Sequence, residues 1–490
     1  MGTKFYLMSK SKNLMRENFA VEKDYGITDE EYEIVDEPYL GYQVHLNKLS
    51  CGWRPLFQMH KNIKTFKELE DFCLKNKMLL ASIFFRSANT NLWKVKAFCS
   101  IVKKSVNCVY LICKKSNRRE RGVMAYEIDF ISVKESEAKQ DADAILIRWK
   151  NEDSYKIAVY DGGFQAHGEK MQEHLDSYYF EAEQDKVIDA VIVSHPDQDH
   201  TSGLKIILEN YTVNALYMNR PWIYAQELYD NNRVIDGRIT ENSLGDRLKK
   251  KYSYIADLEE IADEKGIPIY EVFEGTVIEN VFTVLSPSRD FYLDLIVESD
   301  KTPLEEYSNR GVVYEFAQKV SMYIKKKLEN WFNETLREEV ITSVENEMSV
   351  VLFGAMEEEN LLLVGDAGLR ALNKANSYAI ANGISLKDDI TIMQIPHHGG
   401  RHNVSTSLLN EIIGEPVKEG EECGKDAFVC AADKSDHPLQ MVVNAYVRRG
   451  VRVYTAKGNI IHHHKNMPER PGWTTASNMT FDPNVEDWND

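Results

Sequence analysis

Residues 192–200 are Ile-Val-Ser-His-Pro-Asp-Gln-Asp-His, a stretch that places two histidines and two aspartates within six residues. The preceding run, residues 187–193, is rich in β-branched residues, which predicts a buried strand. Pro196 disfavours helical geometry at the residue before it. We therefore expect these polar side chains to lie in a loop at the end of a strand, where sites in layered α/β folds are commonly built.

The residue types in this loop predict a metal site. Alternate residues of an extended loop point to one side, so we expect His195, Asp197 and Asp199 to converge, with His200 directed at a second ion. Neutral imidazoles and carboxylates are ligands that Zn, Mn and Fe accept. A polar surface loop is the alternative interpretation.

Composition indicates a globular protein with several domains. The chain has 490 residues, of which 43% are hydrophobic and 28% charged, and this length predicts roughly two to four domains. The first residues lack the features of a secretion signal, and no apolar segment reaches the roughly 18 residues that a membrane span needs. Seven cysteines include no Cys-x-x-Cys pair. We therefore expect reduced thiols, a cytoplasmic location and no membrane partner.

Charge is divided unevenly along the chain. Residues 1–124 hold 22 Lys and Arg against 13 Asp and Glu, a net charge of +9, whereas the remainder carries −27. Between Cys73 and Gly122 there are twelve Lys and Arg, one Glu and interspersed aromatic residues. The last basic residues of this segment include Lys114, Lys115, Arg118 and Arg119. Such a segment predicts a nucleic-acid surface, with a solvated basic linker as the equally weighted alternative.

Hydrophobic patterning predicts three parts. Residues 1–122 form an N-terminal domain of unknown function, residues 123–465 an α/β layered domain with a helical insertion at about 225–340, and residues 466–490 a tail. Within the insertion, residues 312–340 carry apolar side chains at near-helical spacing. We expect the insertion or the N-terminal domain to contact a protein partner or a second copy of the chain.

In the layered domain, apolar runs and alternation of apolar with polar residues predict the strands. A hairpin is expected at the C-terminal end of this domain. The predicted strands are Tyr126–Val133, Ala144–Trp149, Tyr155–Tyr160, Phe282–Pro287, Ser349–Phe353, Leu361–Val364, Ile390–Ile395, Phe428–Ala432 and Val451–Thr455.

Most of these strand ends carry a short polar motif. The motifs are Asp161-Gly162-Gly163, His195-x-Asp197-x-Asp199-His200, Gly365-Asp366, Pro396-His397-His398-Gly399 and His437-Pro438. In order and spacing the series resembles the metallo-β-lactamase fold over about residues 125–465. The aspartate in the second position of the first motif, the late Gly-Asp and the Pro-His-His-Gly resemble the hydrolase domain of competence proteins of the ComEC type. This resemblance implies an αββα sandwich with a one- or two-metal site at the sheet edge.

The resemblance also implies roles for individual residues. The implied metal ligands are His195, Asp197, Asp199, His200, Asp366 as the bridge, and one of His397 and His398. His437 matches the family's late His-Pro and would contact the substrate or a metal-held phosphate. Asp161 and His402 are further candidates for substrate contact.

The sequence departs from the family in two respects. Many members supply another histidine between the first motif and the Gly-Asp, yet residues 201–396 contain none, so one ion site is oxygen-rich or open. Carboxylates in place of imidazoles shift the preference from Zn toward Mn, and two ions of either metal are expected. The membrane segments of the competence proteins are also absent, which removes DNA import as an implied role.

These features predict a metal-dependent hydrolase of phosphodiester bonds, most plausibly a nuclease that uses a metal-activated hydroxide. Asp199 or Asp197 would accept the proton of the water, and His437 or His402 would donate to the leaving oxygen. His167, His174 and the run 462–464 are interpreted as core or surface histidines. The alternatives are a hydrolase of small phosphoesters or cyclic nucleotides, and a sensor or partner-binding protein of a bacterial or phage antiviral defence module with conditional activity.

Overall fold

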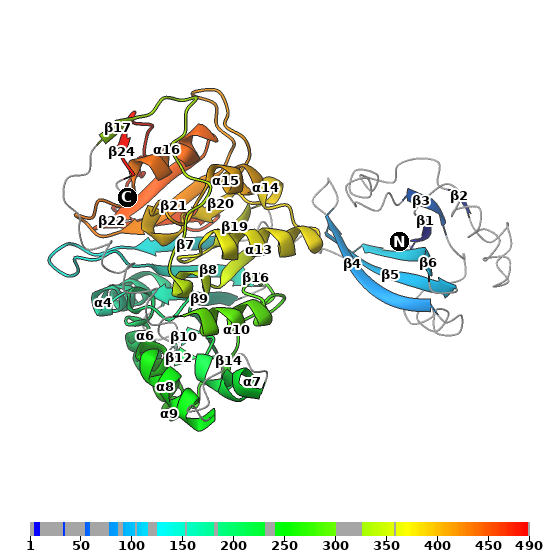
Figure 1. Ribbon diagram of the computed structural model, residues 1–490, viewed down its shortest axis with the longest axis horizontal. Coiled ribbons are helices and arrows are strands. Elements are labelled where there is room, and N and C mark those ends of the chain that lie inside the picture. The colour runs from blue at the N-terminus through cyan, green and yellow to red at the C-terminus, as the bar shows by residue number, and fades with distance from the viewer. Residues whose placement is uncertain are drawn as a thin grey trace. The chain divides into compact units, whose positions relative to one another are not determined.

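The computed structural model describes residues 125–151, 154–180, 185–230, 241–299, 326–356 and 359–488, together with six strands among residues 1–122 (Figure 1). The chain divides into two compact units, Met1–Gly122 and Val123–Asp490, called unit 1 and unit 2 below. Among the described residues no helix is both long and apolar enough to cross a membrane.

Unit 1 contains one antiparallel sheet with the strand order β2-β3-β1-β6-β5-β4. Its strands are β1 (Lys4–Ser9), β2 (Glu33–Ile34), β3 (Arg54–Gln58), β4 (Met78–Arg86), β5 (Leu92–Val102) and β6 (Ser105–Lys115). The backbone of Lys114 pairs with that of Lys94 at the end of β6. The side chains of the basic segment lie outside the described residues, as do Arg118 and Arg119 altogether.

Unit 2 is built on two seven-stranded sheets. The first has the order β14-β13-β11-β9-β8-β7-β23 and the second the order β15-β16-β18-β19-β20-β21-β22. The strands of the first sheet are β7 (Tyr126–Ile131), β8 (Ala144–Asn151), β9 (Ser154–Gly162), β11 (Ala190–Ile192), β13 (Leu216–Tyr217), β14 (Ile269–Tyr270) and β23 (Ile460–Lys465). Those of the second are β15 (Val277–Ile278), β16 (Phe282–Ser286), β18 (Val351–Met356), β19 (Glu359–Leu363), β20 (Ile392–Gln394), β21 (Asp426–Ala431) and β22 (Arg452–Lys457).

Two short ribbons and a set of helices complete unit 2. The ribbons are β10 (Val187–Ile188) with β12 (Thr212–Val213), and β17 (Lys326–Leu328) with β24 (Asn484–Glu486). The helices are α4 (Gln165–His174), η1 (Leu175–Tyr179), α5 (Gln198–Thr201), α6 (Leu204–Asn210), η2 (Pro221–Tyr224), α7 (Ala225–Asp230), α8 (Glu241–Lys251), α9 (Ser253–Lys265), α10 (Arg289–Glu298), α12 (Val344–Glu347), α13 (Leu369–Ala381), α14 (Leu386–Asp389), η3 (His397–Gly399), α15 (Thr406–Ile412) and α16 (Gln440–Arg448).

Alternation along the strands shows how the layers pack. On β8, Ile145 and Ile147 belong to the core between the two sheets, whereas Leu146 belongs to the core that the helices share. On β19, Leu361 packs between the sheets and Leu362 on the helical side. Strands buried on both faces in this way place the two sheets face to face with helices outside. Figure 1 shows α6 and α9 on one side and α15 and α16 on the other.

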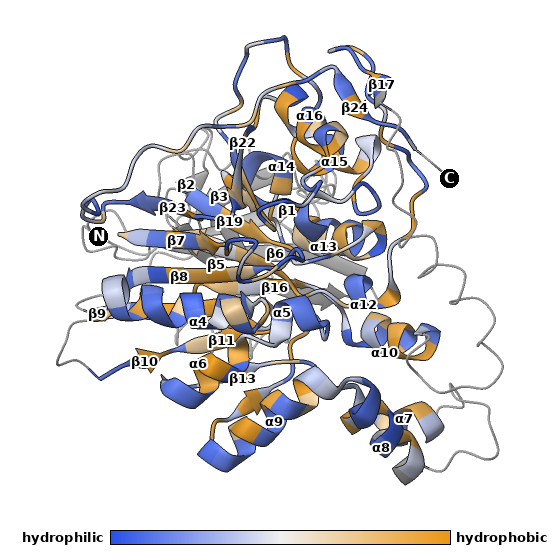
Figure 2. Ribbon diagram, turned by 90° about the vertical axis from the view of Figure 1, so that its left-hand side faces the viewer, coloured by the Kyte–Doolittle hydropathy of each residue, from blue (hydrophilic) through white to orange (hydrophobic). Residues whose placement is uncertain are grey.

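The colouring by hydropathy agrees with these layers. Figure 2 shows the strands of unit 2 as largely hydrophobic and the visible face of α4 as hydrophilic. A mixed α/β architecture is therefore established, and the sheet–sheet packing is consistent with a metallo-β-lactamase fold.

Three features of unit 2 differ from the sequence expectation. Residues 326–340, the described part of the segment with near-helical apolar spacing, form β17 and turns instead of a helix. Glu329 is buried in an ion pair with Arg448, and the Trp331 indole donates to the Val417 carbonyl at 2.8 Å. These tertiary contacts override the apolar spacing. β22 and β23, expected as a closing hairpin, belong to different sheets.

The third difference concerns the helical insertion and the tail. Within 225–340 the helices are interrupted by β14 and β15, which were not predicted, and by β16, which agrees with the predicted strand at 282–287. These strands extend the edges of both sheets. In the tail, β24 pairs with β17, and Val485 is buried. Both segments are therefore part of unit 2 rather than additions to it.

Candidate metal centre

The first motif follows β11, the strand that lies beside β9 in the first sheet. His195 lies in the loop after this strand, but the loop is shorter than expected because α5 begins at Gln198, directly after Asp197 in an extended conformation. Asp199 and His200 are therefore on a helical turn instead of an extended segment. Pro196 confines the extended part to the residues before the helix.

A close backbone contact sets the position of α5. A Cβ atom on Gly203 would lie 2.0 Å from the carbonyl oxygen of Gly162, and the Gly203 amide donates to the Gly163 carbonyl at 2.8 Å. Only glycine fits where two backbones approach so closely. The Gly-Gly turn after β9 is thereby tied to the segment that follows the first motif.

The other predicted ligands follow strands of the second sheet. Asp366 comes three residues after β19, and His397 and His398 come shortly after β20, the neighbouring parallel strand. His397 and His398 adopt positive φ angles of 50° and 55°. Such conformations are uncommon for residues with side chains and persist where the surroundings impose them.

These elements bring seven predicted ligands together. We call this set the Asp366 centre: His195, Asp197, Asp199, His200, Asp366, His397 and His398. The carboxylate of Asp366 lies between two groups of imidazoles. Its Oδ1 is 3.3 Å from Nε2 of His200 and 3.9 Å from Nε2 of His398, and its Oδ2 is 3.7 Å from Nε2 of His397 and 4.0 Å from Nε2 of His195.

The two remaining aspartates each lie beside one of these groups. Asp197 Oδ2 is 3.8 Å from Nε2 of His195, and Asp199 Oδ2 is 3.6 Å from Nε2 of His398 and 3.9 Å from that of His200. Ligand atoms about 2.1 Å from one tetrahedral ion are about 3.4 Å from each other. The spacing within each group is therefore close to what a shared cation requires.

Unsatisfied polar atoms support the same conclusion. Within the described residues, Nε2 of His195, His200 and His398 and Oδ1 of Asp366 are buried and have no hydrogen-bond partner. A buried polar atom without a partner is costly, and a cluster of such atoms facing one another indicates a missing ligand. Imidazole nitrogens and a carboxylate oxygen fit a divalent cation.

The opposite nitrogens of the histidines are held by neighbouring groups. Nδ1 of His200 is 2.8 Å from Asp161 Oδ2, and the other oxygen of Asp161 accepts from the Ser194 amide at 2.7 Å. Nδ1 of His195 is 2.9 Å from Ser194 Oγ. An imidazole that donates from Nδ1 to a fixed acceptor presents the Nε2 lone pair to a metal.

The two adjacent histidines are oriented in the same way. Nδ1 of His397 is 2.8 Å from Asn403 Oδ1, and Nδ1 of His398 is 3.1 Å from the Cys430 carbonyl. Both Nε2 atoms consequently face Asp366, so both histidines are placed to serve as ligands.

Asp143, which no motif singled out, also belongs to this region. It is buried at the start of β8, and its Oδ1 is 3.6 Å from Nδ1 of His398. Together with His200, Asp366 and His398 it forms a group whose potential ligand atoms lie within 4.8 Å of one another. Its Oδ2 accepts from the Gln394 amide at 2.8 Å. Its sequence surroundings are an ordinary acidic loop, which carries no signal of this placement.

The charges of the centre shift several pKa values. Burial and the neighbouring His200 lower the pKa of His195 to about 4, which leaves it neutral. Burial opposes a charge on His200, but the carboxylates of Asp366 and Asp161 raise its pKa well above the usual value. Burial likewise acts against ionised Asp366, yet His397 and His200 hold its pKa well below the usual range. A cation therefore competes with protons for these ligands.

With this geometry in place, the comparison with known families is informative. Residues 141–273 match the metallo-beta-lactamase superfamily. No curated protein matches the chain. The match includes the first motif but ends before Asp366. The family comparison therefore gives no support for Asp366, His397 and His398 as ligands, and their support comes from the structure. It supports the superfamily expected from the motifs and does not distinguish the competence-protein type within it.

The superfamily and the centre together indicate a metal-dependent hydrolase. Its members are hydrolytic metalloenzymes that typically bind divalent metals, and the clustered His and Asp side chains supply a possible site for them. The identity of the metal follows from neither observation.

His437 lies beside the Asp366 centre. The centre of its ring is 6.5 Å from that of His397, and its side chain is 30% exposed. Its Nδ1 is 2.8 Å from Asp141 Oδ2, and Asp141 also accepts from the Ala432 amide and the Ser435 hydroxyl at 2.8 and 2.9 Å. Asp141, a second residue that no motif indicated, thus fixes the ring so that Nε2 is the nitrogen that can meet a substrate.

The remaining candidates lie elsewhere. Asp161 is fully buried and positions His200, so it does not reach a substrate. His402 packs against Trp488, with ring centres 5.4 Å apart. His167 and His174 are buried. The side chains of Lys114 and Lys115 lie outside the described residues, as do Arg118 and Arg119.

Proposed function

We propose that this protein is a metal-dependent phosphodiesterase that cleaves nucleic acid. The observation that carries the proposal is the Asp366 carboxylate, which directs one oxygen toward His200 and His398 and the other toward His195 and His397. A carboxylate between two groups of ligands favours a pair of cations that share it. Two such cations, if bound, would supply Lewis acidity at both the attacking and the leaving oxygen of a phosphodiester.

Each cation would have its own ligand group. His195, His397 and Asp197 would hold one, and Asp199, His200 and His398 the other, with Asp366 common to both. Asp143 is close enough to join the second group or to orient His398. Three or more carboxylates in such a set favour Zn or Mn rather than a metal that demands soft ligands.

The protein groups around the cations have separate tasks. Asp197 and Asp199, whose side chains are 28% and 29% exposed, are placed to accept the proton of the attacking water. His437, held by Asp141, donates a proton from Nε2 to the leaving oxygen. The Nδ1 contacts of the other histidines keep their rings fixed, so little reorganisation is needed when the substrate binds.

The basic segment of unit 1 supports nucleic acid as the substrate. Its twelve Lys and Arg against one Glu over residues 73–122 would attract a polyanion that unit 2, with its excess of acidic residues, repels. The acidity of unit 2 favours the second candidate, a small phosphoester or cyclic nucleotide that reaches the centre without the basic segment.

Metal analysis followed by turnover assays tests the proposal. The protein loaded with Mn or Zn is expected to hydrolyse bis-p-nitrophenyl phosphate and at least one of single-stranded DNA and RNA. The double variant Asp199→Ala/His200→Ala is expected to lose both the metal and the activity, with His402→Ala as the matched control outside the centre. Metal-loaded protein that cleaves none of these substrates would contradict the proposal.

Neutralising the basic segment separates the two substrate classes. Replacement of Lys114, Lys115, Arg118 and Arg119 by Ala is expected to weaken cleavage of nucleic acid and to spare bis-p-nitrophenyl phosphate. Ala at Lys250 and Lys251, an exposed basic pair on α8, is the control. Equal cleavage of nucleic acid by both variants would make the basic segment a linker and remove it as support for a nucleic-acid substrate.

A further inference from the structure

A cavity of about 640 Å³ is lined by segments that neighbour the Asp366 centre in the sequence. Its wall comes from the loop 137–140, the start of α4, the segment α5–α6 and the side chain of Tyr254 on α9. Gln198, one of its lining residues, stands between the candidate ligands Asp197 and Asp199 in the sequence. The loop 137–140 leads to Asp143, whose amide donates to the Asp199 carbonyl at 3.2 Å. The cavity volume is in the range that holds one small molecule or one nucleotide.

The polar lining of the cavity combines charged side chains with neutral hydrogen-bonding groups. Gln140, Gln165 and Gln198 offer amide groups, each with donors and an acceptor, and Ser202 adds a hydroxyl. Gln165 is partly engaged, because its amide donates to Glu169 at 3.1 Å. Amides of this kind match the mixed donors and acceptors on the edge of a nucleobase.

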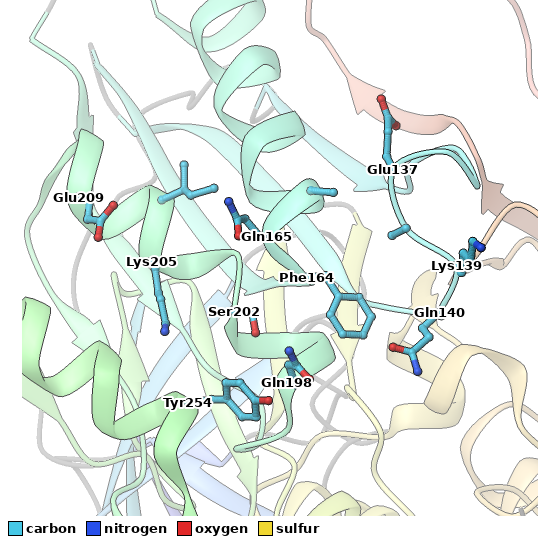
Figure 3. Close-up of a pocket in the computed structure, with 13 residues that line it drawn as sticks. Glu137, Lys139, Gln140, Phe164, Gln165, Gln198, Ser202, Lys205, Glu209 and Tyr254 are labelled. Atoms are coloured by element: carbon cyan, nitrogen blue, oxygen red, sulfur yellow. The ribbon is translucent and has the colours of Figure 1, made fainter. Parts of the chain in front are cut away.

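Two aromatic rings line the same cavity. In Figure 3 the ring of Phe164 is seen between Gln140 and Gln198, and Tyr254 points toward Gln198 from the other side. Both side chains are partly exposed. A base can stack on such a ring whatever its identity, because every base has a π face.

The charges of the lining argue against a phosphate in this cavity. Its acidic residues Glu137 and Glu209 are balanced by Lys139 and Lys205, and Lys205 is already paired with Asp257. A phosphate group would need unpaired cationic groups or backbone amides directed at it. A neutral, flat and polar-edged group is the better match.

We propose that this cavity binds the nucleobase next to the scissile phosphate, so that the protein selects nucleotide substrates over simple diesters. The proposal rests on the phosphodiesterase function proposed above. Stacking on Phe164 and hydrogen bonding to Gln198 hold the base, and the link from base to phosphate through one sugar directs the phosphate to the adjacent centre. Gln198 is the direct connection between the two regions.

Three chromogenic diesters with the same leaving group test the inference. Thymidine 5′-(p-nitrophenyl phosphate) and its adenosine analogue carry a base, and bis-p-nitrophenyl phosphate does not. For wild-type protein the ratio of kcat/KM for the nucleoside esters to that for the simple diester is expected to be high. In Phe164→Ala this ratio is expected to fall roughly 5- to 100-fold, the effect of losing one stacked base. In Gln198→Ala the same ratio is expected to fall as well.

Tyr270→Ala removes an exposed aromatic ring outside the cavity and is the matched control. It is expected to keep the wild-type ratio. A ratio that stays unchanged in both cavity variants would overturn the inference and leave the phosphodiesterase function intact. Failure of the wild-type protein to hydrolyse any diester would overturn the proposed function itself.

Binding of free nucleosides gives a readout without turnover. Thymidine and adenosine carry no phosphate, so saturation-transfer NMR on the metal-free protein detects contacts of the base and sugar alone. Signal transfer to the base protons that is lost in Phe164→Ala and kept in Tyr270→Ala is the expected result. Equal transfer in both variants would place the nucleoside elsewhere and overturn the inference.

Discussion

The described residues of unit 2 include two buried clusters of histidines and carboxylates, and they differ in what occupies their centre. In the Asp366 centre the Nε2 atoms of His195, His200 and His398 and Oδ1 of Asp366 have no hydrogen-bond partner. The second, here called the Asp129 cluster, consists of Glu127, Asp129, His174, His462 and Arg470. Three of its members, Glu127, Asp129 and His462, also have potential ligand atoms within 4.8 Å of one another.

A guanidinium group fills the Asp129 cluster. Arg470 donates to Asp129 Oδ1 at 2.9 Å and to Oδ2 at 2.8 Å, and to Glu127 Oε2 at 2.9 Å. His174 and His462 lie 3.1 and 3.0 Å from the two oxygens of Asp129. The carboxylates therefore already have a cation, supplied by the C-terminal segment of the chain.

The comparison shows that residue types alone do not define a metal site. Both clusters are buried, and both combine imidazoles with carboxylates. The difference is whether a fixed positive group already lies among the carboxylates, because a buried charge needs a partner in either case. The Asp366 centre needs its partner from outside the chain, whereas the Asp129 cluster has it within.

Asp366→Asn is expected to give the largest effect, because this residue is common to both ligand groups. Removing a group that hydrogen-bonds to a metal ligand typically lowers metal affinity about 10- to 100-fold. Removing the shared carboxylate of Asp366 itself should lower the metal affinity further. Elemental analysis after dialysis and bis-p-nitrophenyl phosphate turnover measure the two losses. Asp129→Asn, the matching change in the other cluster, should leave the metal content unchanged; a fall in metal content there would contradict the distinction between the clusters.

Arg470→Ala is expected to destabilise the fold without affecting the metal. Removing one partner of a buried ion pair typically costs about 3–5 kcal/mol, because the carboxylates of Glu127 and Asp129 lose their counter-charge. Urea unfolding followed by circular dichroism measures the free energy of unfolding. Arg401→Ala, a less buried arginine near Trp488, is the control. An unchanged unfolding midpoint for Arg470→Ala would show that the Asp129 cluster does not depend on this guanidinium.

Asp141→Asn is expected to reduce kcat by up to roughly 100-fold, within the contribution of a general acid. The amide no longer holds His437 in the orientation and protonation state that donates to the leaving oxygen. The effect should be large for DNA or RNA, whose leaving alkoxide needs a proton, and small for p-nitrophenolate, which leaves without one. A purely structural role for Asp141 would lower both rates equally, and that outcome would remove it from the mechanism.

Much of the architecture was predictable because local patterns and tertiary contacts agree. On β8, β9 and β21 both faces pack against apolar layers, so their apolar runs are clear. β7 alternates apolar residues with Glu127 and Asp129 and was predicted from that alternation. The motifs at the strand ends indicated the superfamily, and the match to residues 141–273 confirms it at that level. Residues 326–340 could not be predicted, because burial of Glu329 against Arg448 depends on a partner more than a hundred residues away.

The missed site residues have the same physical cause. Asp141 and Asp143 lie in a loop of ordinary acidic composition, and their roles arise from β8, which brings that loop to His437 and His398. The buried position of Arg470 beside Asp129 is likewise a product of folding. The histidines themselves were separated by sequence, because those assigned to the metal lie in strand-end motifs, whereas His174 and the run 462–464 were interpreted as core or surface residues.

The smallest expected effect concerns the pH dependence of stability in the Asp129 cluster. Burial acts to raise the pKa of Asp129, but its hydrogen bonds to His174, His462 and Arg470 hold it well below the usual value. A carboxyl group with a depressed pKa in the folded state contributes stability that is fully present above its unfolded value, near 3.9, and is lost as the pH falls toward its folded value.

The free energy of unfolding of the wild-type protein should therefore decrease between about pH 5 and pH 3 more steeply than that of Asp129→Asn. The difference between the two curves over this interval is expected to be on the order of 1–2 kcal/mol. Urea titrations at each pH measure it, and Asp263→Asn on α9, an exposed carboxyl group, serves as the control. Parallel curves for wild type and Asp129→Asn would mean that Arg470 does not stabilise the ionised form, and the contrast between a filled and an unfilled cluster would have to be withdrawn.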